Sequence, residues 1–154
     1  MKLAKLIGSF VITFAAAFLG SLATTPNIPT WYAALAKPVL NPPNWIFAPV
    51  WTVLYTLMAV SLYLVWTYKG GISKRLLYVA FAAQLALNTL WSVVFFGLHQ
   101  TWLAVIVILL LVAAIVATIM LFKRASKPAA YMLVPYLAWV CFATYLTVGI
   151  SLLN

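Results

Sequence analysis

The feature that most constrains this chain is a set of five long apolar segments without a single charged residue. They cover approximately residues 6–23, 46–68, 76–98, 102–122 and 129–153. A helix needs about 20 apolar residues to cross a hydrocarbon core of ~30 Å, and it pairs its own backbone polar groups on the way. The sequence therefore predicts an all-α, polytopic membrane protein in which residues 1–154 form a single five-helix domain.

The charge composition narrows the chemistry. Of the 154 residues, 68% are hydrophobic and 6% are charged, with nine Lys and Arg but no Asp or Glu. This balance excludes a water-soluble globule. It also excludes mechanisms that need a side-chain carboxylate, such as paired-acid glycoside hydrolysis, Ser-His-Asp triads and Mg²⁺ or Ca²⁺ cages. One Cys (Cys141) and one His (His99) cannot form a zinc site, so we expect no metal and no required cofactor.

The basic residues are distributed unevenly between the loops. Only Lys37 lies on the side of the loop that joins the first two spans. The other eight lie on the opposite side: Lys2, Lys5, Lys69, Lys74, Arg75, Lys123, Arg124 and Lys127. The positive-inside rule then places the N-terminus in the cytoplasm and the C-terminus outside. Because these charges are few and dispersed, the expected partner is the lipid bilayer rather than a nucleic acid.

The first span has a second interpretation. Lys2, Lys5, the apolar run and Ser21-Leu22-Ala23 together resemble a cleavable signal peptide. The run is long for a signal core, and Ala16 with Gly20 forms a pair of small residues suited to close helix packing. We therefore favour a retained span.

The loop between the first two spans, residues 24–45, is the longest. It contains five of the eight prolines: Pro26, Pro29, Pro38, Pro42 and Pro43. Proline prevents one continuous helix, although Thr30 could cap one or two helical turns that Pro38 stops. The composition is compatible with a stiff aromatic lid and equally with a proline-rich connector that rests on the bilayer.

Two primary amides lie near the midpoint of the third span. Gln84 and Asn88 are four residues apart and share a helix face, which Trp91 and Phe95 continue. An unpaired amide in hydrocarbon costs several kcal/mol, so we expect both to face the bundle interior. Aromatic stripes follow in the second span (Pro49, Trp51, Tyr55, Met58) and in the fifth (Pro135, Trp139, Phe142, Leu146).

These faces have two interpretations. Interhelical amides commonly act as glue worth about 0.6 kcal/mol, and aromatic stripes often only pack. Alternatively, stacking rings and convergent donors are the usual walls of a small-molecule pocket. Lys37 is either a residue that extends to the interface or a counter-charge for a ligand carboxylate. His99 is expected to be an interfacial polar residue and Cys141 a small packing residue. Tyr32 is either an interface anchor or, as its neighbours favour, a lid contact.

Several motifs carry a family resemblance over nearly the whole chain. They are Trp31-Tyr32, Leu35, Lys37-Pro38 and Asn41-Pro42-Pro43 in the long loop; Phe47 to Thr52 and Leu54 to Met58; Gln84 to Asn88 with Trp91 and Phe95 to Gly97; and Pro135 to Trp139 with Phe142 to Thr144 and Leu146. In this order they resemble the TspO/translocator protein family, also called tryptophan-rich sensory proteins or peripheral-type benzodiazepine receptors.

The resemblance implies a five-helix bundle, commonly a homodimer, with a pocket on the side of the long loop. Such pockets take tetrapyrroles, including porphyrin and haem, sterols, and benzodiazepine-type or isoquinoline-type drugs. Matched position by position, the implied lining is Tyr32, Pro42, Trp51, Asn88, Trp139, Phe142, Ala143 and Leu146. Some bacterial members are reported to degrade porphyrin in light, which implicates Trp51 and Trp139.

The chain departs from the family pattern in three respects. It lacks the acidic residue that often follows Trp-Tyr, and Thr147 stands where Asn often occurs. The sterol motif at the end of the fifth helix is impossible because the last basic residue, Lys127, precedes Tyr136 and Tyr145.

The sequence thus leads to three functional hypotheses. The first is a membrane receptor or carrier for tetrapyrrole-like ligands, with Lys37, Gln84 and Trp91 added to the lining implied by the family. The second is a light-dependent porphyrin-degrading enzyme. The third is a structural or assembly protein without a ligand. A homodimer through Ala82 and Ala86 of the third span is a further expectation.

Overall fold

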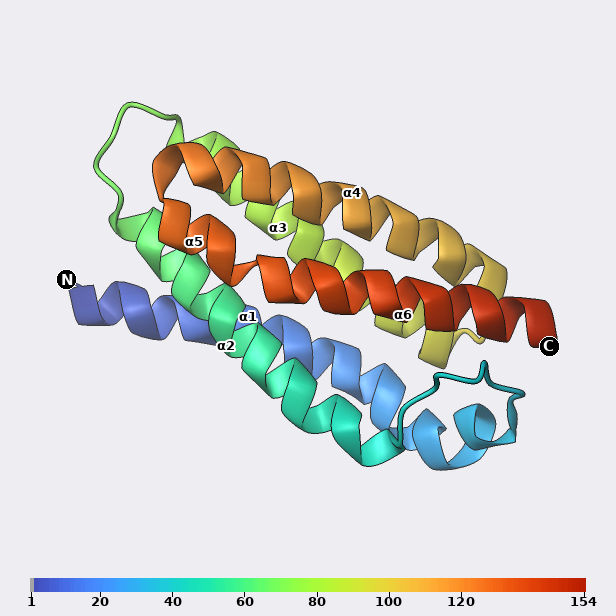
Figure 1. Cartoon of the computed structure of the whole chain (residues 1–154). Coiled ribbons are helices and arrows are strands. Elements are labelled where there is room, and N and C mark those ends of the chain that lie inside the picture. Colours follow the sequence, from blue (N-terminus) through green and yellow to red (C-terminus); the bar gives the residue numbers. More distant parts are fainter. Residues whose placement is uncertain (1) are drawn as a thin grey trace.

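The computed structural model describes residues 2–154 and contains a bundle of helices (Figure 1). Within these residues, five helical segments are long and apolar enough to cross a membrane: Lys2–Tyr32, Asn44–Thr67, Lys74–Gly97, Thr101–Ala125 and Lys127–Leu153. The prediction of an all-α, five-span membrane protein is therefore confirmed. The predicted spans agree with these segments apart from a longer first segment and an interruption in the last.

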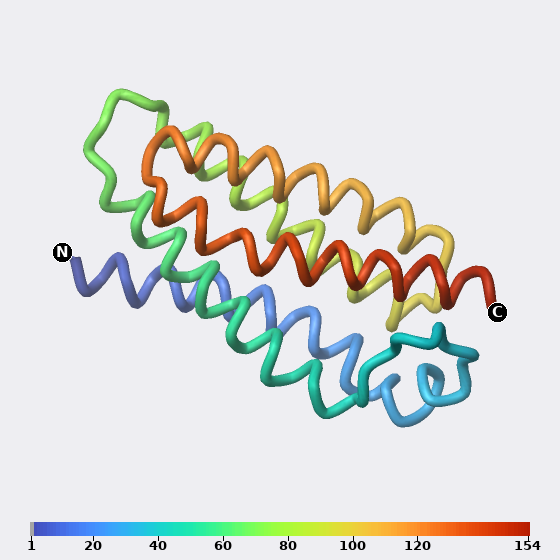
Figure 2. Tube along the Cα trace, in the orientation of Figure 1, coloured from blue at the N-terminus to red at the C-terminus, as the bar shows by residue number. Residues whose placement is uncertain are grey.

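The main helices run back and forth between two ends of the bundle. They are α1 (Lys2–Thr24), α2 (Phe47–Thr67), α3 (Lys74–Ser92), α4 (Thr101–Ala125), α5 (Lys127–Met132) and α6 (Val134–Leu153). We call the end with the N-terminal residues, residues 68–73 and the α4–α5 junction the basic end. The opposite end, with residues 25–46 and the C-terminus, is the loop end (Figures 1 and 2).

The last span is interrupted, which the sequence pattern did not predict. Pro135 has no N–H to donate to the carbonyl of residue 131, and Leu133 adopts φ −88° and ψ −10° between α5 and α6. The Leu133 N–H bonds to the Ala130 carbonyl instead of the Ala129 carbonyl, at 3.1 Å. The Ser61 hydroxyl donates to that released carbonyl at 2.7 Å, so the break is compensated by a bond from α2.

The long loop is a folded element. Residues 25–32 continue α1 as a 3₁₀ turn (Thr25–Asn27) and a π turn (Ile28–Tyr32). Thr30 donates its hydroxyl to the Pro26 carbonyl at 3.1 Å and does not cap a separate helix, so that expectation is wrong. Because Pro26 and Pro29 cannot donate backbone N–H groups, the helical spacing changes at these residues while the chain keeps turning.

Stacking and hydrogen bonds hold the loop on the bundle. The His99 ring stacks on Trp31 at 4.3 Å between centroids and shares a 3.0 Å hydrogen bond with Asn27. The side-chain amide of Asn154 bonds both the N–H and the carbonyl of Ala36, at 3.0 and 2.9 Å. Figure 2 shows the loop beside the C-terminus. The loop is thus tied to the start of α4 and the end of α6, as a lid would be.

The interior of the basic-end half is filled by apolar side chains. Met58, Leu77, Phe122 and Leu133 are fully buried, and the Phe81 and Phe122 rings stack at 6.1 Å. Ala82 and Ala86 lie on the exposed side of α3, where a second copy could reach them, but the homodimer stays a prediction.

Candidate ligand-binding site

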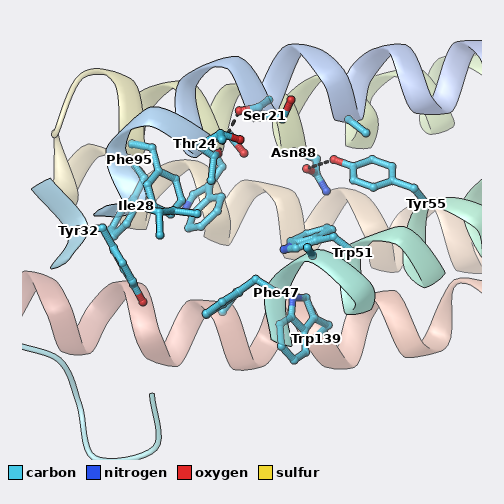
Figure 3. Close-up of a pocket in the computed structure, with 18 of the residues that line it drawn as sticks. Ser21, Thr24, Ile28, Tyr32, Phe47, Trp51, Tyr55, Asn88, Phe95 and Trp139 are labelled. Carbon is cyan, nitrogen blue, oxygen red and sulfur yellow. Dashed lines mark hydrogen bonds between the residues drawn. The ribbon is translucent and has the colours of Figure 1, made fainter. Parts of the chain in front are cut away.

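A cavity of about 450 Å³ lies between α1, α2, α3 and α6 beneath the long loop (Figure 3). Its volume falls within the range of about 300–1,000 Å³ that is usual for small-molecule sites. The lining is mostly aromatic and aliphatic, with hydroxyl and amide groups at intervals. The lining includes Phe18, Ser21, Thr24, Tyr32, Asn44, Phe47, Ala48, Trp51, Thr52, Tyr55, Asn88, Trp91, Phe95, Trp139, Ala143, Leu146 and Thr147.

A layer of hydrogen-bonded polar side chains lies at the inner limit of the cavity. The Tyr55 hydroxyl donates to the Asn88 carbonyl at 2.9 Å. An N–H of the same amide donates to the Tyr136 hydroxyl at 2.8 Å, which in turn donates to the Gln84 carbonyl at 2.8 Å. All four side chains are buried. The layer links α2, α3 and α6 and confirms that both amides face away from lipid.

This layer determines which polar groups remain for a ligand. Asn88 lines the cavity and keeps one N–H free after its bond to Tyr136, because a primary amide has two. The Gln84 amide nitrogen contacts the Met58 sulfur at 4.0 Å, and Gln84 lies outside the cavity lining. Asn88 is therefore the amide that can meet a ligand, and Gln84 supports it through Tyr136.

Indole rings form the walls. Trp51 packs against Tyr55 and Tyr136 with centroids 5.6 and 6.3 Å apart, and Trp139 meets Phe47 edge to face at 6.0 Å. Figure 3 shows that the rings of Trp51, Phe47 and Trp139 form a wall of the cavity opposite Asn88 and the loop. Such rings offer flat apolar surfaces, each of which contributes on the order of 1 kcal/mol to aromatic contact.

Trp91 is a further ring of these walls. Its ring stacks on Phe95 at 5.2 Å and 13°, and it lines the cavity. Its indole nitrogen is buried and has no hydrogen-bond partner within residues 2–154. Buried polar groups are normally paired, but this nitrogen is also closed off from the cavity because it has no accessible surface. Trp91 therefore contributes its ring to the wall rather than a donor.

The hydroxyl groups of the lining serve as acceptors. Ser21, Thr24, Thr52 and Thr147 each donate to a carbonyl of their own helix at 2.7 to 3.0 Å. Their oxygens keep free lone pairs, since a hydroxyl has one hydrogen. Thr147, which replaces the amide expected from the family pattern, thus supplies an acceptor in place of an N–H donor.

Seven of the eleven residues expected at the site from the sequence meet around this cavity: Tyr32, Trp51, Asn88, Trp91, Trp139, Ala143 and Leu146. They come from the loop and from three helices. The structure brings them together because the faces of α2, α3 and α6 that carry them converge at the loop end (Figure 3).

The other four, Lys37, Pro42, Gln84 and Phe142, lie outside the lining. The Lys37 ammonium donates to the Ala33 and Leu35 carbonyls at 3.3 and 3.0 Å and sits 4.9 Å from the centre of the Tyr32 ring. Pro42 supports the loop by accepting from Asn41 at 3.2 Å. Phe142 packs behind Trp139 at 5.5 Å.

The contribution of α1 to the cavity and the role of Tyr136 were not apparent from the sequence pattern. Phe18, Ser21 and Thr24 of α1 line the cavity, because Gly20 lets α1 approach Ser92 of α3 closely. The small residues Ala16 and Gly20 had predicted close packing of the first helix, but not that this helix forms a wall of the cavity. The predicted stripe of the last span placed Pro135, not Tyr136, on the inward face. In the structure Pro135 is exposed and Tyr136 is fully buried.

Comparison with known proteins agrees with this architecture. The sequence model of the TspO/MBR family matches residues 9–153. A tryptophan-rich protein TspO of Archaeoglobus fulgidus is 40% identical over 154 residues, covering 100% of this chain and 99% of its own.

Two further relatives come from distant organisms. The translocator protein of Homo sapiens is 40% identical over 131 residues, which are 84% of this chain and 78% of that protein. A tryptophan-rich sensory protein of Cereibacter sphaeroides is 38% identical over 146 residues, 93% and 90% of the two chains. With matches that span nearly its whole length, the chain belongs to the TspO/MBR family of membrane proteins.

Proposed function

We propose that this protein is a membrane receptor or carrier for tetrapyrrole ligands such as porphyrin and haem. The observation that carries the proposal is the cavity at the loop end, whose lining includes Trp51, Trp91 and Trp139 together with Asn88, which keeps one N–H free. Drug-like isoquinolines and benzodiazepines, which are smaller aromatic molecules with acceptor atoms, are proposed as further ligands of the same cavity.

The chemistry of the cavity suits a flat, electron-rich, anionic molecule. A porphyrin offers π faces for the indoles and ring nitrogens for the free N–H of Asn88, and its two carboxylates remain near the loop. The chain has no Asp or Glu side chain that would repel those carboxylates. Lys37 is the charged side chain of this end, and its ammonium is held by two carbonyls of the loop, from which it can turn toward a carboxylate.

The exposed part of the lining indicates the route of entry. Phe18 and Ser21 of α1, and Ala48 and Thr52 of α2, line the cavity and are exposed. An apolar ligand therefore enters sideways from the bilayer, between α1 and α2, while the loop covers the cavity from the water side. By the positive-inside rule we place the loop end outside and the N-terminus in the cytoplasm.

Quenching of tryptophan fluorescence by protoporphyrin IX tests the proposal. In purified protein we expect saturable quenching that weakens about fivefold in affinity for Trp51→Phe or Trp139→Phe, since each indole contributes on the order of 1 kcal/mol. Trp102→Phe, on the lipid-facing surface of α4 at 56% exposure, is the matched control. Equal affinity in all four proteins would remove these indoles from the site.

A second candidate function shares the same residues. Trp51 and Trp139 both line the cavity, where an indole could donate an electron to a photoexcited porphyrin. Illumination of the complex separates the two functions: a receptor bleaches porphyrin at the rate seen in empty micelles, whereas a degrading enzyme forms a new absorbing product that disappears with Trp51→Phe.

A further inference from the structure

A groove on the lipid-facing surface begins at the basic end, beside Trp66 and Tyr78, and extends along α3 as far as Val93, apart from the cavity. It has a volume of about 720 Å³ and runs between α1 and α3, with part of α2 beneath. Its lining, which shares no residue with the cavity, is Ile12, Ala16, Leu19, Leu62, Trp66, Tyr78, Phe81, Ala82, Leu85, Ala86, Thr89, Leu90 and Val93. The surface is almost wholly apolar, and the Thr89 hydroxyl is bound to the Ala16 carbonyl at 3.2 Å.

Two ammonium groups converge at the basic end of this groove. Lys5 of α1 and Lys74 of α3 both donate to the carbonyl of Trp66, at 3.3 and 3.4 Å. Sharing one oxygen brings the two nitrogens within about 7 Å of each other, where like charges repel. Both side chains are partly buried. The Trp66 ring itself lines the groove and meets Tyr78 edge to face at 6.5 Å.

The protein cannot neutralise this pair of cations. It has no Asp or Glu, and its C-terminus lies at the opposite end of the bundle (Figure 1). Each ammonium has three N–H donors, so a single shared carbonyl leaves most of them free. An ammonium group beside the last carbonyls of α2 stabilises the dipole of that helix. One of the two lysines would be enough for this role.

We propose that the groove and the two lysines form a binding site for an anionic glycerophospholipid. The lipid phosphate bridges the Lys5 and Lys74 ammonium groups, and one acyl chain lies in the groove. Trp66 and Tyr78 mark the level of the headgroups, where such rings are enriched. Basic pockets between transmembrane helices on the cytoplasmic side are suited to anionic headgroups, and the positive-inside rule places this end there.

The dimensions of the groove agree with an acyl chain. Tyr78 and Val93, at its two ends, are separated by about 22 Å along the helix, so an acyl chain that fills the ~15 Å of hydrocarbon in one leaflet occupies only part of the groove. A second copy of this chain could cover the apolar lining at Ala82 and Ala86, but it would bring further Lys and Arg and no carboxylate side chain to Lys5 and Lys74. A lipid supplies both the anion and the apolar chain in one molecule.

Native mass spectrometry of the protein in an uncharged detergent tests the headgroup contact. Phosphatidylglycerol and phosphatidylcholine with the same acyl chains are the probes. The double variant Lys5→Gln/Lys74→Gln should bind phosphatidylglycerol about 25-fold more weakly, at about fivefold for each lysine, and phosphatidylcholine as before. The control Lys123→Gln/Arg124→Gln removes the same charge from exposed positions at the end of α4 and should keep the wild-type preference.

The acyl contact has its own pair of variants. Ala86→Leu narrows the groove and should weaken phosphatidylglycerol binding, whereas Ala83→Leu, an exposed residue of α3 outside the lining, should not. Glycerol phosphate at high excess should not displace the lipid. Circular dichroism and gel filtration verify that each variant is folded.

Four results would overturn the proposal. The first is equal binding of the two lipids, and the second is an equal loss in the two double variants, which would reduce the effect to general surface charge. The third is full displacement by glycerol phosphate, which would make a free anion the occupant. The fourth is loss of a dimer without loss of lipid in Ala86→Leu, which would make a second copy the occupant of the groove. None of these results bears on porphyrin binding at the loop end.

Discussion

The two halves of the bundle are made from the same helices, yet one encloses a cavity and the other has a packed interior. In the basic-end half, buried aliphatic side chains pack with Phe81 and Phe122. In the loop-end half, Trp139 meets Phe47 and Trp51 meets Tyr136 at steep angles of 73° and 67°, and the lining leaves about 450 Å³ open. Side-chain shape, rather than hydrophobicity, distinguishes a packed core from a binding site here.

The polar layer separates the two halves. Tyr55, Asn88, Tyr136 and Gln84 are joined by short hydrogen bonds at the level where the filled interior ends. Because these bonds connect three helices, they hold the helices at a separation that aliphatic contacts alone would not specify. The four predictions that follow test this division of the molecule.

The largest effect is expected from a deletion in the filled half. Phe122→Ala removes a fully buried ring and should lower the free energy of unfolding by about 3 kcal/mol, because the surrounding side chains lose their packing contacts. Unfolding in mixed micelles with increasing denaturing detergent measures it. Met120→Ala, at a position 62% exposed to lipid, is the control. A loss below 1 kcal/mol would show that this half is not tightly packed.

A matched pair of insertions compares the two halves directly. Ala130→Phe places a ring in the filled half, where Ala130 has no exposure, and should destabilise by about 2 kcal/mol through overpacking. Ala143→Phe places the same ring into the cavity, and should leave stability nearly unchanged while weakening porphyrin binding at least tenfold. Similar destabilisation in both variants would contradict the presence of free space beneath the loop.

Removal of one hydroxyl tests the polar layer. Tyr136→Phe deletes the group that connects Asn88 to Gln84 and leaves two buried amides each short of a partner. A cost of about 1 kcal/mol is expected, in line with interhelical hydrogen bonds in membranes. Tyr145→Phe, on the exposed side of the same helix, should cost nothing. Equal stability of the two variants would reduce the layer to a set of dispensable contacts.

The smallest effect concerns the lid. Asn154→Ala removes both bonds to Ala36, so the loop should open more often and release ligand a few-fold faster, with equilibrium affinity changed less. Stopped-flow displacement of porphyrin measures the rate, and Leu153→Ala, at 54% exposure, serves as the control. An unchanged release rate would mean that ligand leaves only by the lateral opening between α1 and α2.

Much of this architecture could be predicted because the bilayer imposes strict rules. Charge-free runs must be helices, and Gln84 and Asn88 must find partners inside the bundle; the structure shows both. Tyr136 and the α1 wall could not be predicted in this way. A tyrosine hydroxyl is as compatible with a position at the membrane interface as with burial in the bundle. The hydroxyls of Ser21 and Thr24 bond to carbonyls of their own helix, which they could do equally well on a face turned toward lipid.

By itself, then, the sequence determined the number of spans and the inward face of α3, since both depend on the cost of placing polar groups in hydrocarbon, and it excluded carboxylate chemistry because it contains no Asp or Glu. The tertiary structure alone decided that α1 closes the cavity, that Lys37 is held by the loop, and that Lys5 and Lys74 meet over one carbonyl. Those outcomes depend on the tilt and rotation of whole helices against each other, which the packing of many side chains sets together and no single residue pattern encodes.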